Sequence, residues 1–112
     1  MQELIRETME SYNNYIINVK EGALKIADKL RTEDIKGALT LISDFSEGSI
    51  WLVDVNKKLM DLGYLVKLEM NVIQEFLIEI NEGLENQDYI LVADIFEYEI
   101  SPFFDQLEQY EI

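Results

Sequence analysis

Residues 3–30 read ELIRETMESYNNYIINVKEGALKIADKL, and this stretch decides the class of fold. Its apolar side chains recur at steps of three and four residues, which places them on one face of an α-helix. That face carries Ile5, Met9, Tyr12, Ile16, Val19, Ala23, Ala27 and Leu30. A helix with one apolar face buries that face against other elements, so the stretch predicts a helical bundle.

Two more helices are predicted before residue 85. The second starts after Thr32, which we expect to be its N-cap, and it ends at about residue 61. Gly63 supplies the left-handed conformation that closes a helix. The third helix is expected over about residues 64–84, because apolar residues recur there with helical spacing.

The fourth helix carries the apolar residues between Tyr89 and Tyr110. Pro102 lies within it, and because a proline ring clashes with the preceding turn, we expect a kink or a break near Ser101. The connections are short, so successive helices should be antiparallel neighbours. The predicted fold is all-α, an antiparallel up-down-up-down four-helix bundle.

Two pairs of segments indicate an internal repeat. YIINVKEG at 15–22 resembles FLIEINEG at 76–83, and LISDFSE at 41–47 resembles LVADIFE at 91–97. A duplication would make the fold two pseudo-repeated helical hairpins. Amphipathic helices also share such patterns without any duplication, so the sequence leaves both explanations open.

The composition bounds the class of protein. With 112 residues the chain suffices for one domain, predicted over residues 1–112. It has no Cys and no His, which excludes thiol and imidazole nucleophiles, disulfides and the usual zinc sites. No apolar run approaches the ~18 residues of a membrane span, and MQELIRETME lacks the layout of a signal peptide. We therefore expect a cytoplasmic protein without a cofactor and without enzymatic activity.

The charge is strongly negative and unevenly placed. Nine Lys and Arg against 23 Asp and Glu give a net charge of −14, which argues against nucleic acid or an anionic membrane as a direct partner. All nine basic residues lie at or before Lys67, and residues 68–112 carry 12 acidic residues and no basic one. The C-terminal half is therefore predicted to present an unbalanced anionic surface.

Six carboxylates occupy matching places in the two halves of the proposed repeat: Glu21, Asp44, Glu47, Glu82, Asp94 and Glu97. Their distribution resembles that of di-metal sites in helical bundles, and without histidine it would favour hard ions such as calcium, magnesium or manganese. Helical periodicity, however, turns Asp44 and Glu47 almost opposite to Ile42, towards water. An all-carboxylate cation site is therefore kept only as an alternative.

Four polar residues fall on apolar faces and predict a buried polar layer: Ser49, Asn56, Glu69 and Glu99. A buried carboxylate needs hydrogen-bond partners or must become protonated. We expect Glu99 to accept hydrogen bonds from Tyr, Ser or Asn side chains and so to fix the register of the helices.

Several apolar residues fall outside the buried stripes of their helices. Such groups on the wet face of a bundle indicate a protein partner or a second copy of the chain. Together with two carboxylates of the fourth helix they make up the predicted interaction surface: Trp51, Ile78, Ile90, Asp94, Glu97 and Phe104.

These observations predict a non-enzymatic acidic interaction module, an adaptor or a small chaperone-like protein. Its concrete form is a basic or amphipathic helix of a partner that binds against the third and fourth helices. Two alternatives stay open. One is the divalent-cation bundle, and the other is an acidic DNA mimic that occupies the groove of a nucleic-acid-binding protein.

Residues 84–104 read LENQDYILVADIFEYEISPFF and resemble a family of small, uncharacterised, all-helical proteins from low-GC Gram-positive bacteria. The C-terminal signature of that family reads roughly Glu-Asn-x-Asp-Tyr-Val-Leu-x-Ala-Asp-Leu-Leu-Glu-Tyr-Glu, followed soon by Pro. EGSIWL at 47–52 is similar to its Glu-Gly-x-x-Trp-Leu stretch. The resemblance implies a helical bundle and a bacterial cytoplasmic setting, and it implies no activity.

Overall fold

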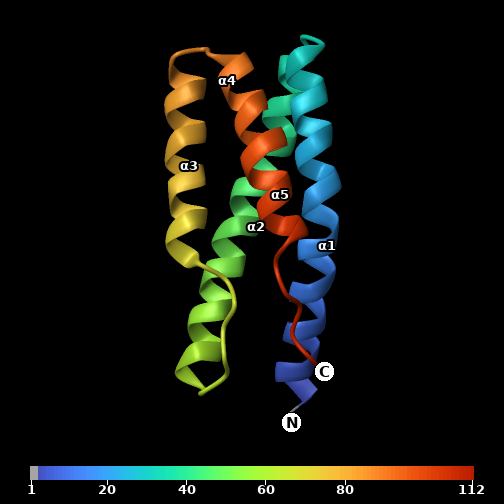
Figure 1. Cartoon of the computed structure of the whole chain (residues 1–112), viewed down its shortest axis with the longest axis vertical. Coiled ribbons are helices and arrows are strands. Elements are labelled where there is room, and N and C mark those ends of the chain that lie inside the picture. The colour runs from blue at the N-terminus through green and yellow to red at the C-terminus, as the bar shows by residue number, and fades with distance from the viewer. Residues whose placement is uncertain (1–2) are drawn as a thin grey trace.

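The structure is a computed structural model that describes residues 3–112. Met1 and Gln2, which begin the predicted domain and the stretch compared with a signal peptide, lie outside the described residues. The helices are α1 (Glu3–Arg31), α2 (Ile35–Asp61), α3 (Met70–Glu85) and a fourth helical stretch made of α4 (Tyr89–Asp94), η1 (Ile95–Ile100) and α5 (Ser101–Asp105). They run alternately up and down along a bundle 47 Å long (Figure 1). The predicted all-α four-helix bundle is confirmed.

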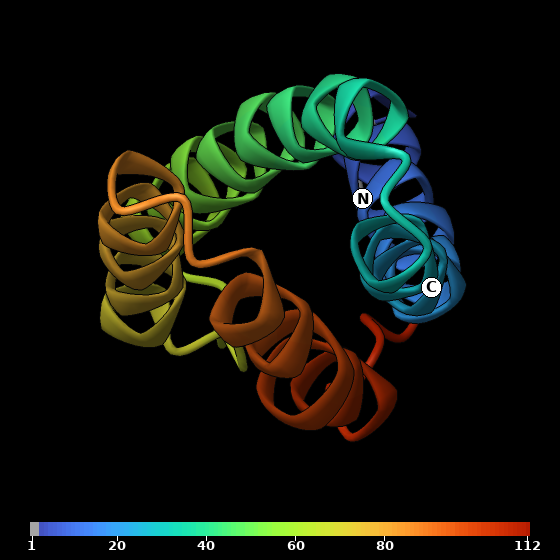
Figure 2. The ribbon, with the colours of Figure 1, turned by 90° about the horizontal axis from the view of Figure 1, so that it is seen from above.

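The helices form a square when viewed along the bundle (Figure 2). Helix α1 packs against α2 and against the fourth stretch, and α3 packs against the other sides of the same two neighbours. Within the described residues no Cα atom of α1 lies within 8 Å of a Cα atom of α3, so these two helices lie on a diagonal. The apolar stripes meet in the centre, where Phe45 contacts Phe96 and Phe104 edge to face with ring centroids 5.2 and 6.4 Å apart.

The two helical hairpins turn in the same way. Glu33 and Gln87 take up left-handed conformations with φ of 66° and 53°, and an aspartate follows each of them. Asp34 and Asp88 then accept a hydrogen bond from the backbone N–H three residues later, at 3.1 Å in both cases. The N-cap of α2 is therefore Asp34, and the prediction of Thr32 is wrong, because the loop continues past it.

This shared turn sets a structural register for the two hairpins. It pairs Glu33 with Gln87, which are 54 residues apart in the chain. The two pairs of segments matched by sequence are offset by 61 and 50 residues, so neither pair has the offset of 54 residues that superimposes the two turns.

The predicted start of the third helix is wrong. Gly63 ends α2 with φ of 90°, as expected, but α3 begins only at Met70. Residues 64–69 are extended, and their exposure alternates along YLVKLE, with Leu68 buried between exposed Lys67 and Glu69. An alternation with period two is typical of an extended chain, and here it overrides the helical spacing.

A kink or a break was expected near Ser101; the fourth stretch is continuous there, so the break is absent. The N–H of Ser101 donates to the carbonyl of Phe96, five residues back, and residues 95–100 form a π-helical turn. Pro102 has no N–H to donate, and it lies directly after this π-helical turn, at the start of α5. The wider turn changes which residues face inwards after Phe96.

Two extended segments complete the lower half of the bundle. Helices α1 and α2 have 29 and 27 residues, whereas α3 has 16, so α3 and the fourth stretch leave the lower part of the first hairpin uncovered. Residues 64–69 and residues 106–112 run along this part (Figure 1). We call the second segment, residues 106–112, the strap. An ion pair of 3.3 Å between Lys67 and Glu108 joins them.

Candidate interaction surfaces

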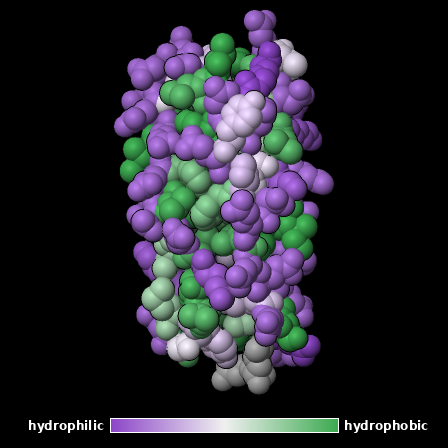
Figure 3. Space-filling model, viewed as in Figure 1, coloured by the Kyte–Doolittle hydropathy of each residue, from purple (hydrophilic) through white to green (hydrophobic). Residues whose placement is uncertain are grey.

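The six residues of the predicted interaction surface do not form one patch. Ile78 and Ile90 are 57% and 71% exposed, on α3 and at the start of α4, and Trp51 faces the groove between α1 and α2. Phe104 is only 3% exposed, so its prediction as a surface residue is wrong. On the face drawn in Figure 3, hydrophobic residues are interspersed with hydrophilic ones along the whole bundle.

Asp94 and Glu97 are bound to a basic residue of the first hairpin. The Arg31 guanidinium lies 2.9 Å from Asp94 Oδ1 and 3.2 Å from Glu97 Oε1. The hydrogen bond to Asp94, followed by the one to Glu97, raises the pKa of Arg31. Further down, Lys20 pairs with Asp105 at 3.0 Å. These five residues define the α1 seam, where the acids of the fourth stretch are paired.

The side of the fourth stretch that faces α3 differs from the α1 seam in the pairing of its carboxylates. Glu75, Glu79 and Glu82 share one face of α3, and among the described residues neither they nor Glu99 of η1 are in an ion pair. Desolvation by neighbouring groups raises the pKa of Glu79, although its side chain is exposed, and the charges of Glu99, Glu75 and Glu82 raise this pKa further. The exposed Ile78 lies on the same face of α3. These five residues define the α3 seam.

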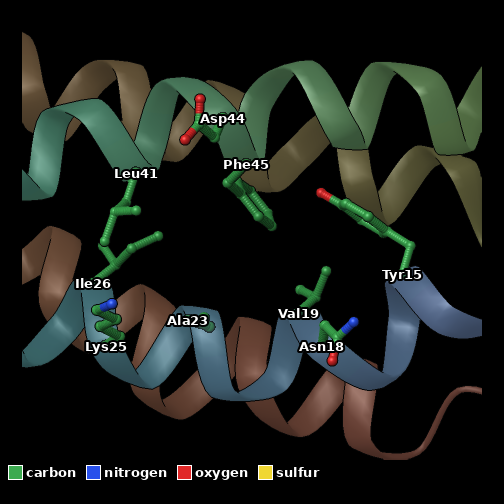
Figure 4. Close-up of a pocket in the computed structure, with 10 residues that line it drawn as sticks. Tyr15, Asn18, Val19, Ala23, Lys25, Ile26, Leu41, Asp44 and Phe45 are labelled. Atoms are coloured by element: carbon green, nitrogen blue, oxygen red, sulfur yellow. The ribbon is translucent and has the colours of Figure 1, made fainter.

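An apolar hollow of about 220 Å³ lies between α1 and α2 (Figure 4). Leu41 and Phe45 point from α2 towards α1, where Ala23 and other apolar residues line the opposite wall (Figure 4). A Cβ atom at Gly22 would meet no atom within 4 Å, so the space beside this glycine is open.

Tyr15 closes the lower end of the hollow. Its hydroxyl occupies the place that a Cβ at Gly48 would take, which explains a glycine inside α2. Burial raises the pKa of Tyr15 to about 12, with a further contribution from the charge of Asp44. The Tyr15 ring meets the Trp51 ring edge on, with ring centroids 6.0 Å apart.

Below Tyr15 and Trp51 a second groove of about 530 Å³ continues towards the exposed residues Leu4 and Leu62. The surface between α1 and α2 is thus mainly apolar, and the few charged residues that line it are of both signs.

The predicted buried polar layer is half right. Ser49 and Asn56 are fully buried, but Glu69 and Glu99 are exposed, so their prediction is wrong. Glu69 lies before the first turn of α3, and the π-helical turn brings Ile100 rather than Glu99 inwards. Within the described residues the Ser49 hydroxyl has no hydrogen-bond partner.

Sequence reasoning missed the partner of Asn56. The Tyr110 hydroxyl donates to Asn56 Oδ1 at 2.5 Å, and the backbone of Tyr110 is hydrogen-bonded to the side chain of Asn13. Asn13 lies among Met9, Tyr12 and Ile16 on the apolar face of α1. A polar residue at such a position indicates a buried hydrogen bond, and this could have been recognised in the sequence.

The six carboxylates matched by the repeat do not converge. Among residues 3–112, no three acidic side chains gather in a way that could hold a metal ion. Asp94 and Glu97 bind Arg31 instead. Within the same part of the chain, none of the helices combines the length and the apolar character needed to cross a membrane.

Comparison with known proteins gives a family. No curated protein and no solved structure matches the chain. Residues 7–110 match the model of a family described as a domain of unknown function, DUF8042. The match covers nearly the whole chain, including the strap as far as Tyr110, and the protein therefore belongs to this family.

Proposed function

We propose that this protein is a non-enzymatic interaction module that binds a basic, amphipathic segment of a partner protein on its α3 seam. One observation carries the proposal: four carboxylates and an exposed isoleucine share this surface, and no basic residue of the described chain pairs with it. The resemblance of residues 84–104 to a bacterial family supports a bacterial cytoplasmic setting for this interaction.

The geometry of α3 fits a helical ligand. Glu75, Ile78, Glu79 and Glu82 follow the spacing of one helix face and extend along about 10 Å of the axis. A partner helix with Lys or Arg on either side of an apolar residue would meet both the carboxylates and Ile78. Binding would replace the repulsion between Glu79 and its neighbours by attraction.

The charge of the seam would act on the rate of association as well. Exposed carboxylates attract a basic partner over about one Debye length, ~8 Å at physiological salt. Association should therefore be fast at low salt and should slow as salt is added. A nucleic-acid-binding protein is one kind of basic partner, and the DNA-mimic alternative would use the same seam.

The test compares two triple variants with equal changes in net charge. The first is Glu75→Gln with Glu79→Gln and Glu82→Gln on the α3 seam. The matched control, Glu7→Gln with Glu21→Gln and Asp28→Asn, changes α1, which lies diagonal to α3. The probe is a labelled amphipathic peptide of Lys and Leu, and fluorescence anisotropy measures its affinity at low and moderate salt.

We expect the seam variant to bind the peptide at least about tenfold more weakly at low salt, because fixed charges facing the ligand are removed. The control variant should stay within about threefold of the unchanged protein, because only long-range attraction is lost. Equal weakening by both variants, with both still helical by circular dichroism, would show that net charge alone attracts the peptide and would refute a site on the α3 seam.

A further inference from the structure

The side chain of Asn13 holds the backbone of the strap. Its Nδ2 donates to the carbonyl of Tyr110 at 2.9 Å, and its Oδ1 accepts from the N–H of the same residue at 2.8 Å. Asn13 is only 8% exposed, so both bonds are shielded from water. An amide that binds both backbone groups of one residue recognises an extended peptide whatever its side chains are.

The side chain of Tyr110 is recognised as well. Its ring meets the Tyr12 ring edge on at 4.9 Å, and its hydroxyl donates to Asn56 Oδ1 at 2.5 Å. Asn56 is fully buried, and its Nδ2 is already bonded to the carbonyl of Leu52. A phenylalanine in place of Tyr110 would leave the Asn56 oxygen without a donor, so the pocket selects a phenol.

The strap has few other attachments. Its first two residues end the helix, through bonds from the N–H groups of Gln106 and Leu107. From residue 108 onwards, within the described chain, the only backbone hydrogen bonds of the strap are the two to Asn13. The ion pair of Glu108 with Lys67 is exposed on both sides, and exposed pairs contribute little.

We propose that Tyr12, Asn13 and Asn56 form a recognition site for an extended, tyrosine-bearing segment of a partner protein, and that the strap is the ligand held there in cis. The site contacts the backbone and the phenol of one residue, whereas the flanking residues Gln109 and Glu111 are exposed. The ligand therefore does not need the sequence of this chain. The site lies between α1 and α2, away from the α3 seam, and does not depend on the proposed function.

The test uses the full-length Tyr110→Ala variant, in which the strap no longer fills the pocket. The probe is a fluorescent peptide with the sequence of residues 105–112, DQLEQYEI. Fluorescence anisotropy should show saturable binding to this variant. Binding to the unchanged protein should be at least about tenfold weaker, because its own strap competes at an effective concentration on the order of millimolar.

Two controls test the contacts one at a time. A peptide with Phe in place of the tyrosine should bind the Tyr110→Ala variant about tenfold more weakly, since Asn56 loses its donor. Adding Asn13→Ala to the variant should weaken the tyrosine peptide by at least about tenfold, because both backbone bonds are lost.

The proposal is overturned if the Tyr110→Ala variant is folded and shows no saturable binding, or if the phenylalanine peptide binds as well as the tyrosine peptide. If the variant does not fold, Tyr110→Phe serves as receptor, because it keeps the ring and both bonds to Asn13. The tyrosine peptide should then bind this variant more tightly than it binds the unchanged protein, and equal affinities would overturn the proposal.

Discussion

The fourth helical stretch makes two seams that differ in charge pairing. Along the α1 seam, Asp94, Glu97 and Asp105 each have a basic partner. Along the α3 seam no carboxylate has a basic partner, and desolvation together with the charges of Glu99, Glu75 and Glu82 raises the pKa of the exposed Glu79. A net charge of −14 therefore says little about any one surface of this molecule. The neighbour of each acidic helix decides whether its carboxylates are paired.

The difference follows from the order of residues and the square arrangement of the helices. All basic residues lie at or before Lys67, so the carboxylates of α3 and of the fourth stretch can pair only with the first hairpin or the chain just after it. The fourth stretch lies beside α1 and reaches Arg31 and Lys20. Helix α3 lies diagonal to α1 and packs against α2, but within the described residues no lysine of α2 forms an ion pair with a carboxylate of α3.

Truncation of a fully buried aromatic residue of the fourth stretch should have the largest effect. Phe96 is fully buried and packs edge on against Phe45. Phe96→Ala should lower the free energy of unfolding by about 3–5 kcal/mol, through lost burial and the cavity left behind. Urea unfolding followed by circular dichroism measures this. A loss below about 1 kcal/mol would contradict the central position of Phe96.

Glu99→Lys should make the α3 seam resemble the α1 seam. A lysine at the surface of η1 faces Glu79, replacing repulsion by an exposed ion pair worth about 0.5 kcal/mol. We expect a small gain in stability at low salt and weaker binding of the basic peptide. Glu111→Lys is the matched control, with the same charge change on the exposed part of the strap. Equal gains in stability by Glu99→Lys and Glu111→Lys would contradict the difference between the two seams.

Arg31→Met is the reverse change, since it leaves Asp94 and Glu97 without their partner. The apolar stem is kept, so packing is preserved while the charge is lost. Stability should fall by less than for Phe96→Ala, and 1 M salt should remove most of the difference by screening. Thermal unfolding at low and high salt checks this, and a loss that does not depend on salt would show that the pairs are not its cause.

Glu79→Gln should give the smallest change, a gain of about 0.3 kcal/mol at pH 7 and low salt, after allowance for solvent screening. Because the folded pKa of Glu79 is raised, the folded chain holds this proton more tightly than the unfolded chain does. Its ionisation therefore opposes folding, and this penalty appears as the pH rises through the folded pKa. The stability difference between variant and unchanged protein should vanish near pH 3, and a difference that persists there would contradict the electrostatic cause.

The sequence was informative where helical spacing controls the structure. The stripe from Met9 to Leu30 was predicted correctly, and so was the left-handed Gly63. The spacing failed where the chain leaves a regular α-helix. Residues 64–69 alternate in an extended conformation, and the π-helical turn before Pro102 exchanges Glu99 and Phe104 between surface and core.

The candidate sites depended on distances that no local pattern contains. The excess of acid after Lys67 was visible in the sequence, but its division into a paired and an unpaired seam requires knowing that α1 is diagonal to α3. Likewise, Asn56 was expected to be buried, whereas its partner Tyr110 lies 54 residues away in the chain, on an extended segment.

Titration of the side-chain carboxyl carbons by nuclear magnetic resonance tests the central claim most directly. If the α3 seam is an unpaired anionic surface, the pKa of Glu79 lies above the ordinary value of a glutamate, and the basic peptide lowers it when it binds. A Glu79 carboxyl that titrates at or below the ordinary value in the free protein would show that its charge is already neutralised, and the proposed docking surface would not exist.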